Sequence, residues 1–543
     1  MTFQSSSFAS GLLSVNESLA SQISSVYVSD VRFALSPRLR VFIVAIGCAV
    51  LFCWSGQGRD RYLGFVTDDG HQWLTGSTLK FAKNWHADGV WADRWAMLEN
   101  PASVEFPDLQ SRGVYPSYPP FSIVGPFVLS HAKRIFGGGE LDVRDLQLYN
   151  RFNQFVIAVL LAVSIFFLTG SFAGAWSGAA IYIFHPVLYY YHQQTFFADH
   201  AVLVLFVGLV VSELAAILWP DRRRRCDAVS CAVLVFAIAT DWLGWVLAPL
   251  LFLHRVATRS DRSPMVREAS LCFLPLFGVA VLYGLQLVAL DAFPVLVHRF
   301  FVRIGADPEG HAAASKFFSQ FWLGYMGKLE TLLYFATLIA CAVGAFKTAK
   351  EKRSLRESPL FSWALFLVLL PPLVHVLVLR NHSSIHGFSA MKFFVPLALF
   401  PFALVPEFVA RRWFPGQRRA IVLVAAMMGG LYVARDHRDW EGLFPDTKTD
   451  LTLAGRVRSH AQFQHVYFSK EFEIEGNPPF QLAYSGKRVY RFRADADIRA
   501  EMKRIASVAN VRPEFFLIRS APCSSQSFRG DEGALCIEPM SAP

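Results

Sequence analysis

The stretch VTDDGHQW, residues 66–73, directly follows the first long apolar run of the chain and places two carboxylates, Asp68 and Asp69, side by side. Charged side chains at the edge of a membrane helix are unfavourable unless they face water, a cation or a reacting group. A histidine, His71, follows within the same stretch. The stretch therefore predicts that a polar, chemically active centre begins where the first membrane helix ends.

The composition of the 543 residues is typical of a protein that crosses a membrane many times. Hydrophobic residues make up 53% of the chain and charged residues only 17%, with a mean hydropathy of +0.35. Soluble proteins carry about 25% charged residues. Apolar runs of roughly 17–22 residues recur along the chain, which is the length that a helix needs to cross a bilayer. We therefore expect an all-α polytopic membrane protein and not a large soluble one.

The formal charge of +10 reflects membrane topology. Lys and Arg collect in short loops between apolar runs, as in Arg222–Arg225 and in the loops 347–357 and 411–419. Cytoplasmic loops of membrane proteins carry such an excess of basic residues. The sequence has no further signature of nucleic-acid binding, so we assign the basic character to orientation in the membrane.

The first span, predicted at 41–57, sets the orientation of the N-terminus. Arg32, Arg38 and Arg40 precede this span, which places the segment 1–40 in the cytoplasm. The Ser-rich N-terminus has neither the short apolar core nor the small-residue cleavage site of a signal peptide, so we expect an uncleaved anchor. Asp68 and Asp69 then lie outside the cytoplasm, at the start of a first outer loop over residues 58–151.

The apolar segment 118–136 decides the orientation of every later span. It opens with Pro119-Pro120 and ends in a basic tetrapeptide, so its length fits either a span or a helix lying in the interface. If it lies in the interface, all the later basic loops fall on the cytoplasmic side. If it crosses the membrane, they all face outward. The positive-inside rule selects the interfacial helix, and a second amphipathic helix is expected at about 69–86.

This orientation predicts about eleven transmembrane helices within residues 41–435. The ten that follow the first are expected at about 152–169, 174–191, 200–219, 228–240, 243–255, 270–290, 329–346, 360–379, 393–410 and 419–434.

The tail, residues 436–543, has the composition of a soluble domain. It contains strand-like pieces at 487–492 and 515–518 and a candidate helix at about 495–508, which together predict a small C-terminal α/β extracytoplasmic domain. Two of the eight cysteines, Cys523 and Cys536, lie in this tail. An oxidising compartment would allow them to form a disulfide, and a pair of free thiols is the alternative.

Ionisable side chains gather at the predicted outer ends of the spans. Each one alone is explained by a solvated loop or by aromatic packing, but their coincidence on one face favours a functional site. Besides Asp68, Asp69 and His71, they are Arg151, His192, Asp199, His200, Asp241, Arg380, His382, His386 and Lys392.

Five short motifs occur in a defined order along residues 40–435. They are Thr67-Asp68-Asp69 before a helix, Tyr118-Pro119-Pro120-Phe121, Asn150-Arg151-Phe152, His185–Tyr191 followed by Asp199, and Met391–Pro396. This ordered set resembles the GT-C membrane glycosyltransferases that use polyprenyl-phosphate-linked sugars. The resemblance is greatest to glycosyltransferase family 39, the branch of protein O-mannosyltransferases and lipid A aminoarabinose transferases.

The resemblance implies an inverting glycosyltransferase whose site opens outside the cytoplasm. Asp68 would be the general base that takes the proton of the acceptor hydroxyl, with Asp69 in support, and the reverse assignment is the alternative. Asp241 is a departure, because some relatives carry Lys in that segment. If that Lys contacts the lipid phosphate, another cation must do so here, with Lys392, Arg380 or His382 as candidates. The residues expected to bind donor or acceptor are Arg151, His192, Asp241, Arg380, His382, His386 and Lys392.

The implied cofactor is a divalent metal cation, held by Asp69, Asp199 and His200, and members of the family differ in this respect. The implied partners are a polyprenyl-phosphate sugar donor and an extracytoplasmic glycan, lipid or protein acceptor, at the plasma (inner) membrane. Alternative functions are a lipid-linked glycan transporter or flippase, an oligosaccharide ligase or polymerase, and a non-enzymatic assembly protein. A transporter would predict an internal repeat and broken helices in mid-membrane, and the sequence shows no such repeat.

Overall fold

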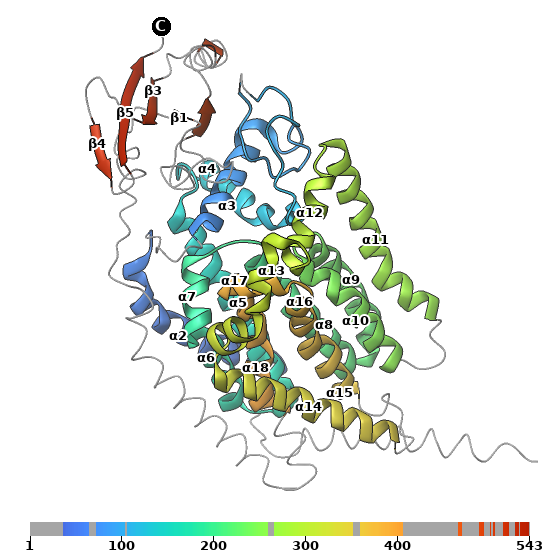
Figure 1. Cartoon of the computed structure of the whole chain (residues 1–543). Helices are drawn as coiled ribbons and strands as arrows, with labels where there is room; N and C mark the ends of the chain where they lie inside the picture. The colour runs from blue at the N-terminus through green and yellow to red at the C-terminus, as the bar shows by residue number, and fades with distance from the viewer. Residues whose placement is uncertain are drawn as a thin grey trace, which may run out of the picture.

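The computed structural model describes most of residues 36–404 and five strands near the C-terminus (Figure 1). The described residues are 36–64, 72–103, 106–258, 265–350, 359–404, 465–469, 488–492, 500, 503–504, 514–520, 527–530 and 533–541. Asp68, Asp69, His71 and Cys523 lie outside them, and so does the predicted span at 419–434. The catalytic pair and the disulfide therefore stay predictions.

Residues 37–404 are built mainly of helices. The α-helices are α2 (Pro37–Arg59), α3 (Gln72–Asn84), α4 (Val124–Ile135), α5 (Val143–Thr169), α6 (Phe172–Phe184), α7 (Pro186–Gln194), α8 (Ala198–Leu218), α9 (Arg223–Ile238), α10 (Trp242–Thr258), α11 (Met265–Ala289), α12 (Phe293–Ile304), α13 (Pro308–Ser315), α14 (Lys328–Lys350), α15 (Pro359–Trp363), α16 (Leu370–Val378), α17 (Arg380–Ile385) and α18 (Phe394–Leu399). Short 3-10 or π-helical turns continue or join them: η1 (Asp60–Tyr62), η2 (Trp85–Gly89), η3 (Pro120–Ile123), η4 (Pro220–Arg222), η5 (Phe318–Tyr325), η7 (Ala364–Leu369), η8 (Gly387–Phe393) and η9 (Phe400–Leu404).

Five helical stretches in the described part of the chain are long and apolar enough to cross a membrane. They are α2, α5, α8, α11 and the continuous stretch from α15 to α16. A sixth candidate joins η5 to α14 through a bend of 101°. The chain is therefore a multi-pass membrane protein. The predicted number of about eleven spans is not confirmed.

Several predicted spans are shorter apolar helices or broken ones. The span expected at 174–191 is divided at His185, because Pro186 begins α7 and cannot donate the backbone hydrogen bond that would continue α6. The apolar helices at 172–184, 242–258 and 387–402 have 10–17 residues each, fewer than the roughly 20 that a typical crossing uses. Sequence hydropathy counts such segments as spans, because it does not register where the helix axis changes direction.

Helix α5 is the long central helix of the bundle and packs against α2, α6 and α8. It begins with a capping box in which Asp142 accepts from the Asp145 amide at 3.0 Å and Asp145 accepts from the Asp142 amide at 2.9 Å. It ends at Gly170, whose φ of 69° suits the left-handed C-cap. Its buried face carries apolar residues and several polar ones near its N-terminal end, which is the end closest to the candidate site.

The long loop between α2 and α5 contains the two helices α3 and α4. Segment 118–136 forms η3 and the twelve-residue helix α4, which is about 18 Å long and too short to cross a hydrocarbon core of about 30 Å. This length fits the predicted interfacial helix. Between α3 and η3, the buried Arg112 guanidinium donates to Asp93 and Asp88, both at 2.7 Å. These two ion pairs hold the later part of the loop against the part that directly follows α3.

The strands at the C-terminus form one five-stranded sheet in the order β2-β1-β3-β5-β4. They are β1 (His465–Ser469), β2 (Arg488–Phe492), β3 (Glu514–Ser520), β4 (Ser527–Gly530) and β5 (Gly533–Ser541). β1 pairs in parallel with β2 and β3, and β5 pairs antiparallel with β3 and β4. β2 and β3 coincide with the strand-like pieces of the sequence. A separate extracytoplasmic α/β domain stays a prediction.

Candidate active site

Asp199 is the carboxylate on which the candidate site is centred. It lies in the first turn of α8, which begins after the extended residue Phe197, and its side chain is only 1% exposed. Lys392 Nζ donates to one carboxylate oxygen, Oδ1. The Tyr118 hydroxyl donates to the other, Oδ2, at 3.1 Å. A buried carboxylate is stable only when it is paired and hydrogen-bonded in this way.

Two hydrogen bonds to the backbone of residues 117 and 118 hold Tyr118 in place. The carbonyl of Tyr118 accepts from the Tyr283 hydroxyl at 3.0 Å, and the carbonyl of Ser117 accepts from Trp242 Nε1 at 2.9 Å. The ring packs edge-on against Phe197. Burial raises the pKa of the Tyr118 hydroxyl well above its ordinary value of 10.0, against the opposing effect of Arg303. The hydroxyl therefore stays protonated and acts as a neutral hydrogen-bond donor.

His382, in the short helix α17, completes the cluster around Asp199. Its Nε2 lies 3.1 Å from the Tyr118 hydroxyl oxygen and 3.9 Å from Asp199 Oδ2. The His386 ring is centred 4.5 Å from its own ring. Burial, followed by the charges of His386 and Arg303, lowers the pKa of His382 well below 6.5. At neutral pH the imidazole is therefore uncharged, and Lys392 is the cation that balances Asp199.

A second buried acid, Asp241, precedes α10 and pairs with a histidine. His375 Nε2 of α16 lies 3.4 Å from Asp241 Oδ1, and the same oxygen accepts from the Leu243 amide at 2.8 Å. The side chains of Asp241 and His375 are 0% and 1% exposed. The sequence predicted Asp241 at the turn between two spans, and the structure places it in the turn before α10, where the buried carboxylate caps α10 and faces His375.

Two arginines of α12, Arg299 and Arg303, face the segment that carries Tyr118. Arg303 lies over the Tyr118 ring at 4.4 Å and donates to the Ser117 carbonyl at 3.0 Å. Arg299 lies over the Tyr115 ring at 5.2 Å and donates to the Ser117 hydroxyl at 3.2 Å. Among the side chains that the structure describes, no carboxylate forms an ion pair with either guanidinium. This pair of half-buried cations is able to receive an anion.

The remaining predicted site residues lie around this cluster or apart from it. Arg151 of α5 donates to Asp60 at 2.6 Å and to Gln193, which ties α5 to the end of α2 and to α7. His192 contacts the Asn150 and Tyr182 side chains, each at 3.3 Å. Arg380 is exposed and donates to the carbonyl of Ile304, at the end of α12, at 2.9 Å. His200 packs against the rings of His192 and Phe388.

Sequence reasoning missed four residues of this arrangement as site residues: Tyr118, Arg299, Arg303 and His375. Two signals were available in the sequence. His375 is an ionisable residue inside an apolar run, which is a functional candidate by default. Arg299 and Arg303 are four residues apart and therefore share one face of an amphipathic helix. Nothing local in the sequence connects Tyr118 to Asp199.

Of the predicted metal set, the structure describes Asp199 and His200. Both oxygens of Asp199 are engaged, one by Lys392 and one by Tyr118. Within the described ranges, no group of three His, Cys, Asp or Glu side chains is arranged to hold a metal ion. Asp69, the third member of the set, lies outside those ranges.

A bundle of membrane-crossing helices, a long loop with two helices after the first of them and a buried polar cluster at one end of the bundle are the features to compare with solved structures. The ArnT protein of Cupriavidus metallidurans, in a crystal structure with bound undecaprenyl phosphate, has a TM-score of 0.50 to this chain at 13% identity, covering 93% of this chain and 98% of ArnT. At this identity the likeness shows the fold, and the GT-C fold predicted from the sequence is confirmed.

Two further solved structures are similar over most of the chain. ArnT from the same organism in the apo state gives a TM-score of 0.49 at 13% identity, with 93% of this chain and 98% of ArnT covered. The oligosaccharyltransferase AglB of Archaeoglobus fulgidus, in complex with an inhibitory peptide and a dolichol-phosphate, gives 0.48 at 11% identity, with 89% of this chain and 69% of AglB covered. No family model and no curated protein matches the sequence.

Proposed function

We propose that this chain is an inverting glycosyltransferase that moves a sugar from a polyprenyl-phosphate donor to an extracytoplasmic acceptor. The observation that carries the proposal is the buried cluster of Asp199, Tyr118, His382 and Lys392 beside Arg299 and Arg303, two cations without a carboxylate partner among the described side chains. Its support is the GT-C fold, which this chain shares with a protein crystallised with undecaprenyl phosphate.

The two arginines of α12 are the groups that we assign to the donor phosphate. A guanidinium suits phosphate because its N–H groups match two oxygens at once, and charge-assisted bonds of this kind are about twice as strong as neutral ones. Two of the three cations considered from the sequence are less suited to this role. Lys392 is paired with Asp199, and His382 is uncharged at neutral pH because its pKa is lowered by burial. Arg380, which like Arg303 donates to one backbone carbonyl, stays the alternative cation.

The reaction that we propose has one bond-forming and one bond-breaking event. The acceptor hydroxyl oxygen attacks the anomeric carbon of the sugar, while the bond from that carbon to the phosphate oxygen breaks and its electron pair stays with the polyprenyl phosphate. The hydroxyl proton goes to a carboxylate, which we assign to Asp68 with Asp69 in support. Arg299 and Arg303 stabilise the charge that grows on the departing phosphate.

Asp199 and Tyr118 take no proton in this scheme. Tyr118 keeps its proton because burial raises its pKa, and Asp199 is neutralised by Lys392. We assign them to holding the segment 115–118 and α17 in place around the donor. The divalent cation stays a prediction, and no step depends on it. It is tested by measuring transfer after treatment with EDTA and again after Mg²⁺ or Mn²⁺ has been added back.

The experiment that tests the proposed function is a transfer assay with the purified full-length chain in nanodiscs. The probes are radiolabelled sugars on undecaprenyl phosphate, with the matching nucleotide sugars as the negative comparison. The acceptor class is first identified by mass spectrometry of glycolipids and envelope glycans from a deletion strain. Transfer from the lipid donor alone supports the proposal. A deletion strain with unchanged glycans, and a purified chain that transfers from no lipid donor, would overturn it.

The role of Asp68 is tested in the same assay. We expect Asp68→Asn to abolish transfer and to leave the melting temperature unchanged, because the amide keeps the shape of the side chain but accepts no proton. Asp69→Asn is the matched comparison and is expected to retain part of the activity. If Asp69→Asn is inactive and Asp68→Asn is active, the two carboxylates have the reverse roles.

A further inference from the structure

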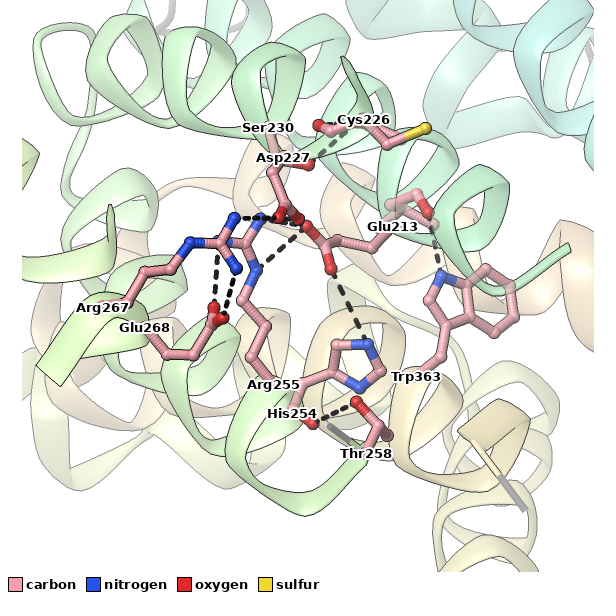
Figure 2. Close-up of polar contacts among 12 residues, drawn as sticks. Glu213, Cys226, Asp227, Ser230, His254, Arg255, Thr258, Arg267, Glu268 and Trp363 are labelled. Atoms are coloured by element: carbon pink, nitrogen blue, oxygen red, sulfur yellow. Dashed lines mark hydrogen bonds and ion pairs between the residues drawn. The ribbon is translucent and has the colours of Figure 1, made fainter. Parts of the chain in front are cut away.

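Three carboxylates and two arginines form a second polar cluster at the other end of the helices that carry the site (Figure 2). Arg255 of α10 donates to Glu213 of α8, with its Nε at 3.2 Å, and lies 3.5 Å from Asp227 of α9 and 3.7 Å from Glu268 of α11. The Arg255 side chain is 0% exposed and the three acids are at most 4% exposed. Arg267 closes the cluster from its half-exposed edge.

Arg267, at the half-exposed edge of the cluster, connects α11 to α9. Arg267 donates to Asp227 at 3.0 Å and to Glu268 at 3.4 Å. The three ion pairs of Arg255 and the Arg267–Asp227 pair each bridge two helices, so the cluster links α8, α9, α10 and α11, whereas the Arg267–Glu268 pair lies within α11. Removing one partner of such a buried network is expected to lower the melting temperature, because the remaining charge stays buried.

Glu213 and Arg255 are the same number of residues from the site acids Asp199 and Asp241 along their helices. Glu213 follows Asp199 by fourteen residues along α8, and Arg255 follows Asp241 by fourteen residues along α10. With a rise of about 1.5 Å per residue, the ion pair lies about 21 Å from each acid along its helix. The two helices run in the same direction, from the site to the cluster. One ion pair therefore sets the axial offset between them.

The helical stretch from α15 to α16, which carries His375 of the site, also contacts this cluster. His254, next to Arg255, lies 3.9 Å from Glu213 Oε2 through Nε2 and 3.0 Å from the Ser362 hydroxyl through Nδ1. The indole of Trp363 donates to the Val210 carbonyl of α8 at 2.8 Å. From Ser362, the helical stretch runs back toward the site, where it carries His375.

At the site end, one short segment is held by both α8 and α10. The Tyr118 hydroxyl is bonded to Asp199 at the start of α8, and the adjacent Ser117 carbonyl is bonded to Trp242 at the start of α10. If α10 slipped by one turn, about 5.4 Å, relative to α8, these two bonds would not form together. Apolar packing between membrane helices specifies register weakly, whereas a buried polar contact can fix it.

We propose that Arg255 and Glu213 are positioning residues that fix the register of α10 against α8 and so set the geometry of Tyr118 and Asp199 at the opposite end of the bundle. This inference rests on the proposed function for its kinetic consequences, but its structural consequence is independent of any activity. A displacement of about 1 Å at a reacting centre lowers a rate by about 100-fold. A shift in register is therefore expected to act on turnover more than on binding.

The first test compares Glu213→Gln with the control Asp221→Asn in the purified full-length chain. Asp221 is exposed, with its side chain 77% accessible, and lies near the same end of α9. We expect Glu213→Gln to lower kcat at least tenfold per folded molecule with little change in the KM for the lipid donor, and Asp221→Asn to match the wild type. An unchanged kcat per folded molecule, accompanied only by a lower melting temperature, would show that the cluster serves stability alone.

The second test needs no activity. Hydrogen–deuterium exchange of the peptide over 115–121 is measured in both variants, because this segment lies at the site end, far from Glu213. The Phe121 amide in it donates to the Ala239 carbonyl, just before α10, at 3.1 Å. We expect at least threefold faster exchange in Glu213→Gln only. Exchange equal to that of the control would overturn the inference, whether or not the wild type transfers sugar.

A milder variant keeps the test decisive if Glu213→Gln does not fold. Ser362→Ala removes one hydrogen bond, to His254, and leaves every charged side chain of the cluster in place. We expect about a threefold decrease in kcat, with unchanged donor KM, and faster exchange over 115–121 than in Asp221→Asn. A variant that folds like the wild type and keeps both its kcat and its exchange rates would contradict the proposal.

Discussion

Lys392 and Asp199 are 193 residues apart in the chain and form an ion pair in which each side chain is only 1% exposed. The lysine belongs to η8 and the aspartate to the first turn of α8, so the pair closes the helical bundle between its early and late parts. Because the second oxygen of Asp199 is bonded to Tyr118, the ion pair also sets where the outer loop meets the bundle. The predictions below follow from this arrangement.

Lys392→Met is expected to destabilise the protein by about 3–5 kcal/mol, because it leaves the Asp199 carboxylate buried and unpaired. Thermal unfolding of the detergent-solubilised chain measures the loss. The double variant Lys392→Met/Asp199→Leu replaces both charges with apolar groups and is expected to recover most of the stability without recovering activity. Lys328→Met, at an exposed position, is the control. A single variant as stable as this control would contradict the pairing.

Tyr118→Phe is expected to lower kcat about tenfold while leaving the fold intact. The variant keeps the ring that packs on Phe197 but removes the hydroxyl shared by Asp199 and His382. The hydroxyl donates to a charged carboxylate, and a hydrogen bond to a charged group contributes about 1.5–3 kcal/mol, where about 1.4 kcal/mol corresponds to a factor of ten in rate. Tyr115→Phe is the matched control, because the ring of this neighbouring tyrosine packs against Phe81 and Phe197. Equal activity of the two variants would argue against a role for the Tyr118 hydroxyl.

Arg303→Gln is expected to raise the KM for the lipid donor roughly 10- to 100-fold. Charge-assisted hydrogen bonds contribute about 1.5–3 kcal/mol, and binding changes tenfold for every 1.4 kcal/mol. The assay is transfer at increasing donor concentration, repeated at low and high salt. Arg134→Gln, which removes an exposed arginine paired with Glu140, is the control and is expected to leave KM unchanged. If the two variants give the same KM, α12 does not hold the phosphate.

His382 is expected to make stability depend on pH on the acid side. Because burial lowers its pKa in the folded protein below 6.5, the unfolded chain binds a proton near pH 6.5 while the folded protein does not. The contribution of His382 is therefore fully present above about pH 6.5 and is lost as the pH falls, by up to about 1.4 kcal/mol per pH unit. Melting temperatures from pH 7.5 to 5 should fall less in His382→Gln than in the wild type.

The control for this series is His131→Gln, at an exposed position on α4. It is expected to follow the wild-type curve at every pH. Parallel curves for the wild type and His382→Gln would show that His382 titrates alike in the folded and unfolded states, and the uncharged state assigned to it at neutral pH would be wrong.

The membrane orientation is tested with a reporter fused after Asp436. We expect the reporter to read as extracytoplasmic, because the interfacial assignment of segment 118–136 leaves an odd number of crossings before the tail. A second fusion within the basic loop 347–357 should read as cytoplasmic. A cytoplasmic signal from the first fusion would reverse the orientation and place the Asp199 cluster on the cytoplasmic face.

The helices were the most predictable part of the structure. The predicted spans at 152–169, 200–219 and 270–290 agree with α5, α8 and α11, apart from added turns at their ends. Hydropathy and backbone hydrogen bonding act over a few residues, so each such helix is specified by its own segment. The breaks inside predicted spans, as at Pro186, were harder to predict, because a proline near a helix end and one inside a helix look alike in sequence.

The site was predictable in its members but not in its contacts. The sequence alone determined that the chain spans a membrane, that its fold is GT-C, and that Asp199, His382 and Lys392 belong among the ionisable residues at span ends. Tertiary structure alone decided that these three meet at Tyr118, that Asp241 faces His375, and that Arg151 pairs with Asp60. The physical reason is that helices form through contacts between near neighbours in the chain. A buried charge is stabilised by whichever partner the packed bundle brings to it, however distant that partner is in sequence.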